Sequence, residues 1–479
     1  MDTLARKKLL ANPSVRKTLP HLVLSVRSAL PEGQFEEREQ AVLVLLEELA
    51  RCVLTADLAD LSASLGEHLL VNGIAYRRHQ AGMGHYASLN GCLDVPRSTY
   101  RKVGVRNGPT VVPLELLAGL FEGATPAMAY NIADGYARCD MRQHGAALTL
   151  ALRVPPPRAT LERMAKRIAE RVHEATPRVE ALVRRKEKLP SGTRGIVMGL
   201  DRTSAPMAEP RAAGASAEPR IPRKTARVRA APAPIEVNFR MAYVGTVSLV
   251  DGDGKALVTR RYGAPASDCP KAMAKRMAAD VEAALSRDPT LVVGCVQDGA
   301  PEMWNVTGGA LGALEERGVL ASWKEVVDRY HVLERLGEVL VVIEPVSAQR
   351  AATLHAWNAR LDADDAAIDE IEEAIQIAYG KLLPHKQREL DEHLVYLHNN
   401  KHRMRYAALI DAGLPIGSGV TESAAKTVVN QRAKGSGQRW SEDGLRGVLA
   451  LRAIHHSDRL PAFWAELSRV CQVCVRQAA

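Results

Sequence analysis

The chain has 479 residues, of which 46% are apolar and 25% are charged, an ordinary composition for a globular protein of two or three domains. Its apolar runs, such as residues 339–343, are far too short to cross a bilayer, so we expect a cytoplasmic protein with no membrane partner. The formal net charge of +9 favours a polyanionic partner, and nucleic acid in particular.

The seven cysteines are scattered and odd in number, which excludes a disulfide framework in a chain of this length. We therefore expect reduced thiols. Only Cys471 and Cys474 have the spacing of metal ligands. They lack a second pair and fall on an apolar helical pattern, which favours a structural role over a zinc site.

Residues 1–84 are expected to form mainly helices, because apolar residues recur there at helical spacing. Pro, Gly and Asn breakers between strand-like stretches predict a small hairpin over residues 85–108. Two helices around Gly123 follow, and residues 159–174 predict a further helix with a basic surface. We interpret 85–190 as a DNA-binding region, in which that last helix belongs either to a helix-turn-helix unit or to a bundle with a solvated basic face.

From residue 191 the pattern becomes that of an α/β domain. One apolar, β-branched run ends in Asp201, a hairpin turns at Asp251–Gly254, and a second buried-type strand ends in Asp298. Helical segments separate these strands, which indicates a mixed sheet with flanking helices. We assign a first part of a catalytic core to 191–343, a helical insertion to 344–411, and the last part of the core with C-terminal helices to 412–479.

A basic insert, residues 205–234, interrupts the first part of this core. It is rich in Pro, Ala and Arg, a composition typical of a segment that is disordered when free. Two interpretations have equal weight, a basic arm that orders on DNA and a solvated insert without function. In the first, the DNA contacts come from Arg220, Arg223, Lys224, Arg227 and Arg229.

Residues 417–440, GSGVTESAAKTVVNQRAKGSGQRW, predict a helix that carries one acid, Glu422, among basic and amide side chains. A single Glu at a helix start most often complements the helix dipole. The alternative is that Glu422 joins Asp201 and Asp298, since side chains at strand ends gather at one edge of a layered sheet. Converging carboxylates repel each other unless a cation neutralises them, and Mg²⁺ prefers oxygen ligands of this kind.

The order and surroundings of these acids resemble those of DDE transposases of bacterial insertion sequences, with the ISKra type of the wider Mutator-like group as the nearest match. The resemblance rests on VMGLDRTSAPM around Asp201, VVGCVQDGAPEMW around Asp298, VVDRYHVLERL with Asp328 and His331, and the Glu422 segment. It covers roughly residues 190–460. It implies an RNase H-like catalytic domain behind a mainly α-helical DNA-binding region.

By this resemblance, Asp201, Asp298 and Glu422 bind two Mg²⁺ or Mn²⁺ ions, and His331 of the Asp-x-x-His motif assists catalysis. Taken alone, a His on an apolar segment such as His331 is more often structural, and Trp440 can equally be a core residue instead of a base-stacking one. The remaining DNA contacts are expected from the Glu422 helix and the segment after it. Including the indole, these residues are Lys426, Asn430, Arg432, Lys434, Arg439 and Trp440.

The resemblance therefore predicts a transposase that binds double-stranded DNA, cuts strands at the element ends and joins them to target DNA. A homodimer or higher oligomer is expected, because two ends must meet. No nucleotide cofactor is expected, in keeping with the absence of a GxxxxGK[ST] stretch. The alternatives are an RNase H-like nuclease that cleaves without joining and a catalytically idle DNA-binding protein.

Overall fold

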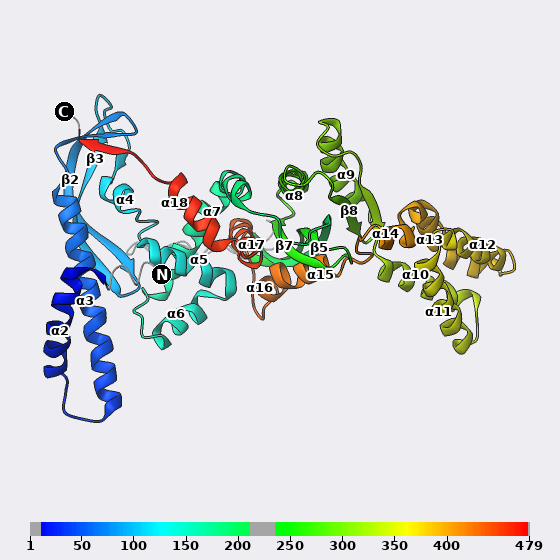
Figure 1. Cartoon of the computed structure of the whole chain (residues 1–479), viewed down its shortest axis with the longest axis horizontal. Coiled ribbons are helices and arrows are strands. Elements are labelled where there is room, and N and C mark those ends of the chain that lie inside the picture. The colour runs from blue at the N-terminus through cyan, green and yellow to red at the C-terminus, as the bar shows by residue number, and fades with distance from the viewer. Residues whose placement is uncertain (1–10, 211–234, 478–479) are drawn as a thin grey trace, which may run out of the picture. The chain divides into compact units, whose positions relative to one another are not determined.

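The computed structural model describes residues 11–210 and 235–477. The chain forms two compact units (Figure 1). The N-terminal unit comprises Met1–Ile168 together with Cys471–Ala479, and the central unit comprises Ala169–Val470. Each unit contains one five-stranded sheet, and the chain as a whole is of mixed α/β type.

The N-terminal unit begins with two helices and continues as an antiparallel sheet of order β10-β1-β2-β3-β4. Its core lies between this sheet and nearby helices and includes the buried Leu69, Tyr86, Leu93 and Tyr100. The bounds of its elements are α2 Pro13–Ser28, α3 Phe35–Ala63, β1 His68–Val71, β2 Ile74–Ser88, β3 Gly91–Lys102, β4 Thr110–Val111, α4 Pro113–Ala118, α5 Pro126–Arg138, α6 Met141–Leu150 and β10 Val475–Gln477.

Two expectations for this unit were wrong at their boundaries. The strands begin at His68 and not at residue 85, because Asn72 and Gly73, both with positive φ, form a tight turn that pairs Val71 with Ile74. The C-terminal segment, expected with the last part of the core, belongs to the N-terminal unit, since Val475 pairs with Val71 of β1. Cys471 and Cys474 lie beyond the last helix, are exposed, and belong to no group of three metal-ligand residues among the described residues.

Helix α7, Arg158–Lys186, contains the basic segment at 159–174 and continues for more than two further turns. Leu161, Met164, Ile168 and Val172 form its buried face, as the helical spacing predicted. The helix is a single element of 29 residues. Its buried face is apolar over the first four turns and includes Glu180 and Arg184 further on, so the choice between the two interpretations offered above stays open.

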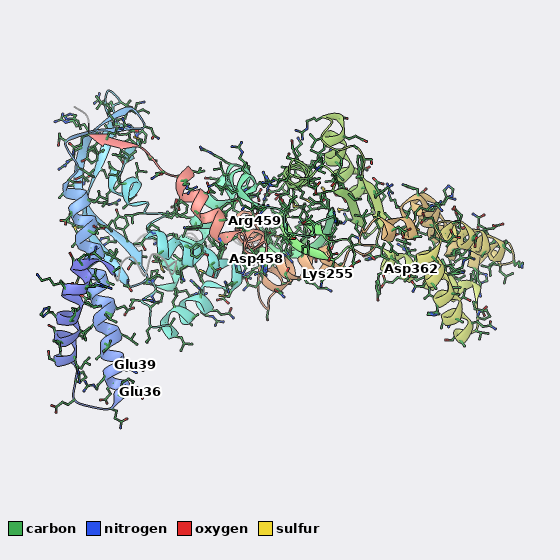
Figure 2. All side chains as sticks on the ribbon, in the orientation of Figure 1. Glu36, Glu39, Lys255, Asp362, Asp458 and Arg459 are labelled. Carbon is green, nitrogen blue, oxygen red and sulfur yellow. The ribbon has the colours of Figure 1, made fainter. Side chains whose placement is uncertain are left out.

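The central sheet has the order β7-β6-β5-β8-β9. Strand β5 pairs antiparallel with β6 and parallel with β8, β6 pairs antiparallel with β7, and β8 pairs parallel with β9. The hairpin turn predicted at Asp251–Gly254 joins β6 to β7, just before Lys255 (Figure 2). The strand bounds are β5 Gly195–Pro210, β6 Ile235–Val250, β7 Ala256–Pro265, β8 Val292–Gln297 and β9 Lys324–Val327.

Strand β5 does not end at Asp201 as its apolar pattern predicted. It continues to Pro210 as a two-stranded ribbon with β6, in which Pro210 lies opposite Ile235. Pairing with β8 stops at Met198, so Asp201 lies on a part of β5 that has β6 as its only neighbouring strand, while β6 still pairs with β7. Residues 205–210, which the expected basic insert included, are therefore strand, and residues 211–234 lie outside the described part of the chain.

Helices surround the central sheet and also form the segment after it. Residues 344–411, expected as a helical insertion, contain four α-helices and a short 3₁₀ turn, shown in yellow to orange in Figure 1. One continuous apolar core runs from the sheet into this insertion and includes Val293, Val332, Ile368 and Leu397. The helix bounds are α8 Pro270–Leu285, α9 Pro301–Glu316, α10 Arg329–Ile343, α11 Ser347–Ala363, α12 Ala367–Tyr379, α13 Pro384–Asn400, α14 Tyr406–Asp411, α17 Glu442–His456 and α18 Leu460–Val470.

In the part of the chain that the structure describes, no helix combines the length and the apolar character needed to cross a membrane.

Candidate active site

Asp201 directly follows a buried stretch of β5, the middle strand of the central sheet. All six residues from Gly195 to Leu200 are buried, which fixes the backbone just before the acid. Gly199 permits a close helix approach, because a Cβ at this position would lie 2.2 Å from Thr421 Oγ1. The helix that carries Glu422 can therefore pack directly against the strand that carries Asp201.

Asp298 immediately follows β8, as its sequence pattern predicted. Its Oδ1 accepts a hydrogen bond from Ala300 N at 3.0 Å, and Gly299 adopts φ +95° to turn the chain into α9. The hydroxyl of Tyr396 in α13 donates to the Asp298 carbonyl oxygen at 3.1 Å. The helical insertion thus contacts the backbone of the second predicted acid.

Glu422 lies in the first turn of α15, Gly419–Ala424, which begins after Ser418. The helix continues as a π-helical segment, η2, over Ala425–Asn430, and the short α16 follows at Gln431–Ala433. A π-helix has a wider turn than an α-helix, so the helical face predicted for Lys426 and Asn430 from a period of 3.6 does not extend through η2. Such segments in helices are frequent at functional sites.

Arg452 of α17 stabilises the wide turn of η2. It is 3% exposed, and its Nε donates to the carbonyl oxygens of Thr427 and Val428 at 3.1 and 2.9 Å. These are backbone acceptors of η2, where the regular α-helical hydrogen-bond ladder is interrupted. Sequence reasoning missed Arg452, because nothing in its local pattern distinguishes it from an exposed helical arginine.

One cavity brings the predicted residues together. Its lining includes Asp201, Asp298, His331 and Glu422, which come from four separate segments of the central unit. Ser418 also lines it, and its Oγ lies 3.4 Å from Glu422 Oε1. All four residues that sequence reasoning assigned to catalysis thus face one space of about 100 Å³.

Asp328 organises one wall of this cavity although it does not line it. The residue is 2% exposed and caps α10, since its Oδ1 accepts from Tyr330 N at 2.6 Å and from His331 N at 3.3 Å. Its Oδ2 accepts from Ser418 N at 2.5 Å and also from the Ser418 hydroxyl. One carboxylate therefore joins the start of α10 to the start of the Glu422 helix.

The ionisation of these residues reflects their mutual charge. Burial raises the pKa of Asp201, and the carboxylates of Asp298 and Glu422 raise it further. Burial also opposes ionisation of Asp328, but the contacts with His331 and Ser418 outweigh it and lower the pKa of Asp328 to about 2. The same Asp328 contact, an ion pair with 3.6 Å between Nδ1 and Oδ1, raises the pKa of His331 to about 8.

The cavity offers the oxygen donors that a divalent cation requires. The ligand atoms of Asp328, His331 and Glu422 all lie within 4.8 Å of one another. Among the described residues, Asp201 and Asp298 belong to no group of three whose ligand atoms lie this close together. The charge of Asp201 nevertheless interacts with those of Glu422 and His331, and the charge of Asp298 interacts with that of His331. The carboxylates of Asp201, Asp298 and Glu422 share this cavity, and a cation would reduce their mutual repulsion, so the residues present fit Mg²⁺ or Mn²⁺.

The predicted DNA-binding residues near Glu422 divide into two groups. Lys426, Lys434 and Arg439 are exposed and able to contact a phosphate backbone. Thr203 fixes part of this surface, since Lys434 Nζ donates to its hydroxyl at 2.9 Å and that hydroxyl donates to Asn430 Oδ1 at 3.1 Å. Strand β5 thus contacts the Glu422 helix at Thr203 as well as at Gly199.

Arg432 and Trp440 form the second group and are buried, each 7% exposed. The Arg432 guanidinium lies 4.7 Å from the centre of the Trp440 ring, and Trp440 Nε1 donates to the Ala433 carbonyl oxygen at 3.1 Å. Trp440 also pairs with the backbone of β5 through Pro206 and Ala208. This environment is that of a core residue, which is the alternative given for Trp440.

The other predicted DNA contacts belong to the basic insert. They lie outside the described residues, and these are Arg220, Arg223, Lys224, Arg227 and Arg229. Arg202, which directly follows the first acid, pairs with Glu302 of α9 at 2.7 Å. Glu302 also accepts a hydrogen bond from the Tyr243 hydroxyl at 2.6 Å. The Arg202 charge is therefore turned toward α9.

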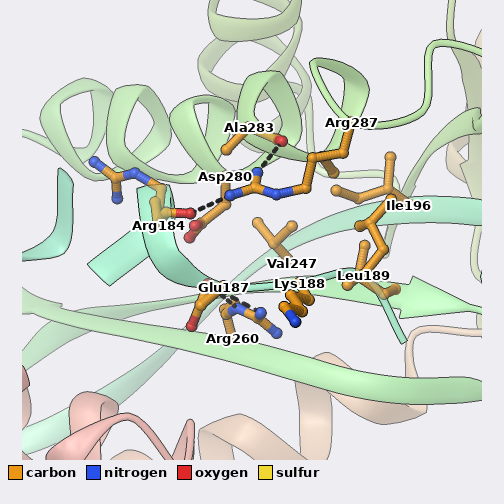
Figure 3. Close-up of a pocket in the computed structure, with 12 residues that line it drawn as sticks. Arg184, Glu187, Lys188, Leu189, Ile196, Val247, Arg260, Asp280, Ala283 and Arg287 are labelled. Atoms are coloured by element: carbon orange, nitrogen blue, oxygen red, sulfur yellow. Dashed lines mark hydrogen bonds and ion pairs between the residues drawn. The ribbon is translucent and has the colours of Figure 1, made fainter. Parts of the chain in front are cut away.

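A second cavity in the central unit is lined by charges but by none of the predicted site residues (Figure 3). Arg260 Nη2 donates to Glu187 Oε2 at 3.0 Å, and Arg287 donates to the Arg184 and Ala283 carbonyl oxygens. This second cavity is small, with a volume of about 20 Å³. These ion pairs and carbonyl contacts indicate a structural network between α7, α8 and the sheet.

The chain matches no protein-family model and no curated protein sequence.

Proposed function

We propose that the chain is a divalent-metal-dependent DNA transposase with an RNase H-like catalytic domain. One observation carries the proposal. Asp201, Asp298, His331 and Glu422, selected from the sequence alone, line a single cavity although up to 221 positions separate them (422 − 201). Convergence of acids from distant segments is what phosphodiester chemistry with bound metal ions requires.

The surrounding fold supports the same proposal. A mixed five-stranded sheet carries the first acid on its central strand β5 and the second just after the parallel neighbour β8. The helical insertion at 344–411 lies in the chain between the second acid and Glu422, as in the family that the sequence resembles. Helix α10, with Asp328 at its cap, leads from the sheet into that insertion.

The proposed ligands are Asp201, Asp298 and Glu422, and the bound ions supply activation of a water or a 3′-hydroxyl and neutralise charge at the phosphate. Asp328 favours the protonated form of His331, which can then donate a hydrogen bond to a phosphate oxygen. Exposed Lys426, Lys434 and Arg439 bind the DNA backbone beside the acids. The basic insert supplies further phosphate contacts, and the active form is a dimer or higher oligomer on double-stranded DNA.

The test is a reaction of labelled element-end DNA with a plasmid target, in buffer with Mg²⁺ and in buffer with EDTA. Wild type is compared with Glu422→Gln and with Asp253→Asn, which removes an exposed carboxylate from the β6–β7 turn of the same unit. The proposal predicts metal-dependent cleavage and joining in wild type and Asp253→Asn, and neither in Glu422→Gln. Cleavage without joining identifies a nuclease, and DNA binding without cleavage in wild type identifies an idle DNA-binding protein; both outcomes refute the proposal.

A further inference from the structure

The outer face of the β2–β3 hairpin carries three side chains of types that bind transition metals. The register places His85 directly opposite Asp94, and Cys92 lies two residues before Asp94 on the same side of β3. Burial alternates over residues 84–88 of β2 and 91–96 of β3. Tyr86, Leu93 and Val95 point into the core, while the three polar residues His85, Cys92 and Asp94 are exposed.

The donor atoms of these three residues already lie close together. His85 Nδ1 is 2.6 Å from Asp94 Oδ1, and Cys92 Sγ is 3.6 Å from the same oxygen. All three donor atoms lie within 4.8 Å of one another. The twelve paired positions of the β2–β3 ladder fix this arrangement, so it does not depend on a flexible loop.

We propose that His85, Cys92 and Asp94 form a binding site for a borderline transition-metal cation of the Zn²⁺ class. A nitrogen, a sulfur and an oxygen donor are the ligands that Zn²⁺ takes, whereas Mg²⁺ takes oxygen donors alone. Three protein ligands on an open surface leave the fourth tetrahedral position to water or to a further ligand. On binding, Cys92 releases its thiol proton to solvent and coordinates as the thiolate.

The site is distinct from the acid cavity and independent of the proposed function. Its three residues belong to the N-terminal unit, and the acids belong to the central unit. The charge of Arg51 in α3 acts on both Asp94 and Cys92, and Arg51 is itself paired with Glu48. A bound cation would link β2 to β3 close to the turn that connects them.

The test is titration of the full-length protein with Co²⁺, whose coordination by a thiolate gives a near-ultraviolet charge-transfer absorption that oxygen ligands do not give. The protein carries Glu422→Gln, so that binding at the acid cavity is weakened. We expect one equivalent of Co²⁺ with the thiolate signature, displaced by Zn²⁺. Cys92→Ser should abolish the signature, and His85→Ala or Asp94→Asn should shift the titration to higher Co²⁺ concentration.

The matched control is Cys52→Ser, which removes another exposed thiol from the same unit and should leave the titration unchanged. Because all three proposed ligands are exposed, the variants are expected to fold, and circular dichroism verifies this. Absence of the thiolate signature in the parent protein, or its persistence in Cys92→Ser, overturns the site. Either result leaves the DNA cleavage assay unaffected, so the two proposals fail separately.

Discussion

The sheet of the central unit and the sheet of the N-terminal unit each have five strands, but the first is mixed and the second is antiparallel. Strand β5 is buried continuously from Gly195 to Leu200, whereas β3 alternates between buried and exposed residues from Gly91 to Pro96. A strand buried on both faces can offer polar side chains only where the covered part ends, while an alternating strand offers them along one whole face.

This difference sets how strongly charges interact in each unit. Asp201 within β5, Asp298 just after β8 and Glu422 line one cavity, and burial together with the other two carboxylates raises the pKa of Asp201. Behind the same sheet, Arg459 binds both Glu187 and Asp280 in a buried network. On the antiparallel sheet, His85 and Asp94 form an exposed pair. Charged residues should therefore matter far more in the central unit than on the outer face of the N-terminal sheet.

The largest effect is expected at the acid cavity. Asp201→Asn removes a proposed metal ligand and should lower the rate of DNA cleavage by more than about 100-fold, since loss of outer-sphere partners alone costs 10–100-fold at metal sites. DNA binding and its salt dependence should remain, because phosphate contacts come from Lys and Arg. Single-turnover kinetics measure the rate of cleavage, and filter binding across a salt series measures DNA binding and its salt dependence. Cleavage at the wild-type rate would contradict the ligand assignment.

The next effect concerns Arg459, which is 5% exposed and labelled in Figure 2. Arg459→Met leaves the buried Asp280 without its partner and should lower the free energy of unfolding by about 3–5 kcal/mol, measured by urea denaturation. The double variant Arg459→Met with Asp280→Leu should recover part of that loss, because no unpaired charge remains. If Arg459→Met alone is as stable as wild type, the buried network contributes nothing to the free energy of unfolding.

Substitution of Asp328 tests whether its hydrogen bonds fix the wall of the cavity, which Asp328 itself does not line. Asp328→Ala removes the cap of α10 and both hydrogen bonds to Ser418, and should cost about 1–3 kcal/mol of unfolding free energy. Cleavage should also slow, because Ser418 no longer fixes the start of the Glu422 helix. Asp364→Ala, which removes a surface carboxylate bonded to Ala366 N, should leave cleavage unchanged. Equal effects of both variants on cleavage would refute a positioning role for Asp328.

A pH series separates the buried network from ordinary surface charge. Burial opposes ionisation of Glu187, but Arg459 and Arg260 lower the pKa of Glu187 from 4.5 to about 2. Since the folded pKa is below the unfolded one, Glu187 stabilises the fold above pH 4.5, and this stabilisation is lost as the pH falls from 4.5 toward 2. At neutral pH the free energy of unfolding of wild type should exceed that of Glu187→Gln by about 2 kcal/mol, after allowance for solvent screening. A difference that stays constant in urea denaturation down to about pH 3 would exclude this linkage.

The smallest effect is expected on the antiparallel sheet. Asp94→Asn breaks only an exposed pair with His85, so without added metal the urea midpoint should not change measurably. With Zn²⁺ present, wild type should gain more stability than Asp94→Asn, in which the proposed site binds the ion more weakly. A clear loss of stability in EDTA would mean that the outer face of this hairpin contributes to the fold directly.

Sequence reasoning located the local elements well and the long-range ones poorly. Alternation and burial patterns predicted β8 and the β6–β7 turn, because each depends on residues close together in the chain. The pairing of Val475 with Val71 was not predictable, since a three-residue strand has no pattern that names a partner about 400 positions away. The Asn72–Gly73 turn was available as a signal and was overlooked.

The candidate site shows the same division. Asp201, Asp298 and Glu422 could be selected because a family resemblance pointed to them, and their place in one cavity follows from the sheet. The supporting contacts were not predictable. Arg452 binds the carbonyls of η2 from a different helix, and Ser418 binds Asp328 across 90 positions of sequence. Such contacts depend on three-dimensional packing and leave no trace in local composition.

Whether Asp298 binds a metal ion is tested most directly by Asp298→Cys, assayed for DNA cleavage in Mg²⁺ and in Mn²⁺. A thiolate is a poor ligand for Mg²⁺ and a better one for Mn²⁺, so direct coordination predicts an enzyme that is inactive in Mg²⁺ and partly active in Mn²⁺. Wild type should cleave in both ions. Full cleavage by Asp298→Cys in Mg²⁺ would contradict a ligand role for Asp298 and, with it, the proposed metal-dependent mechanism.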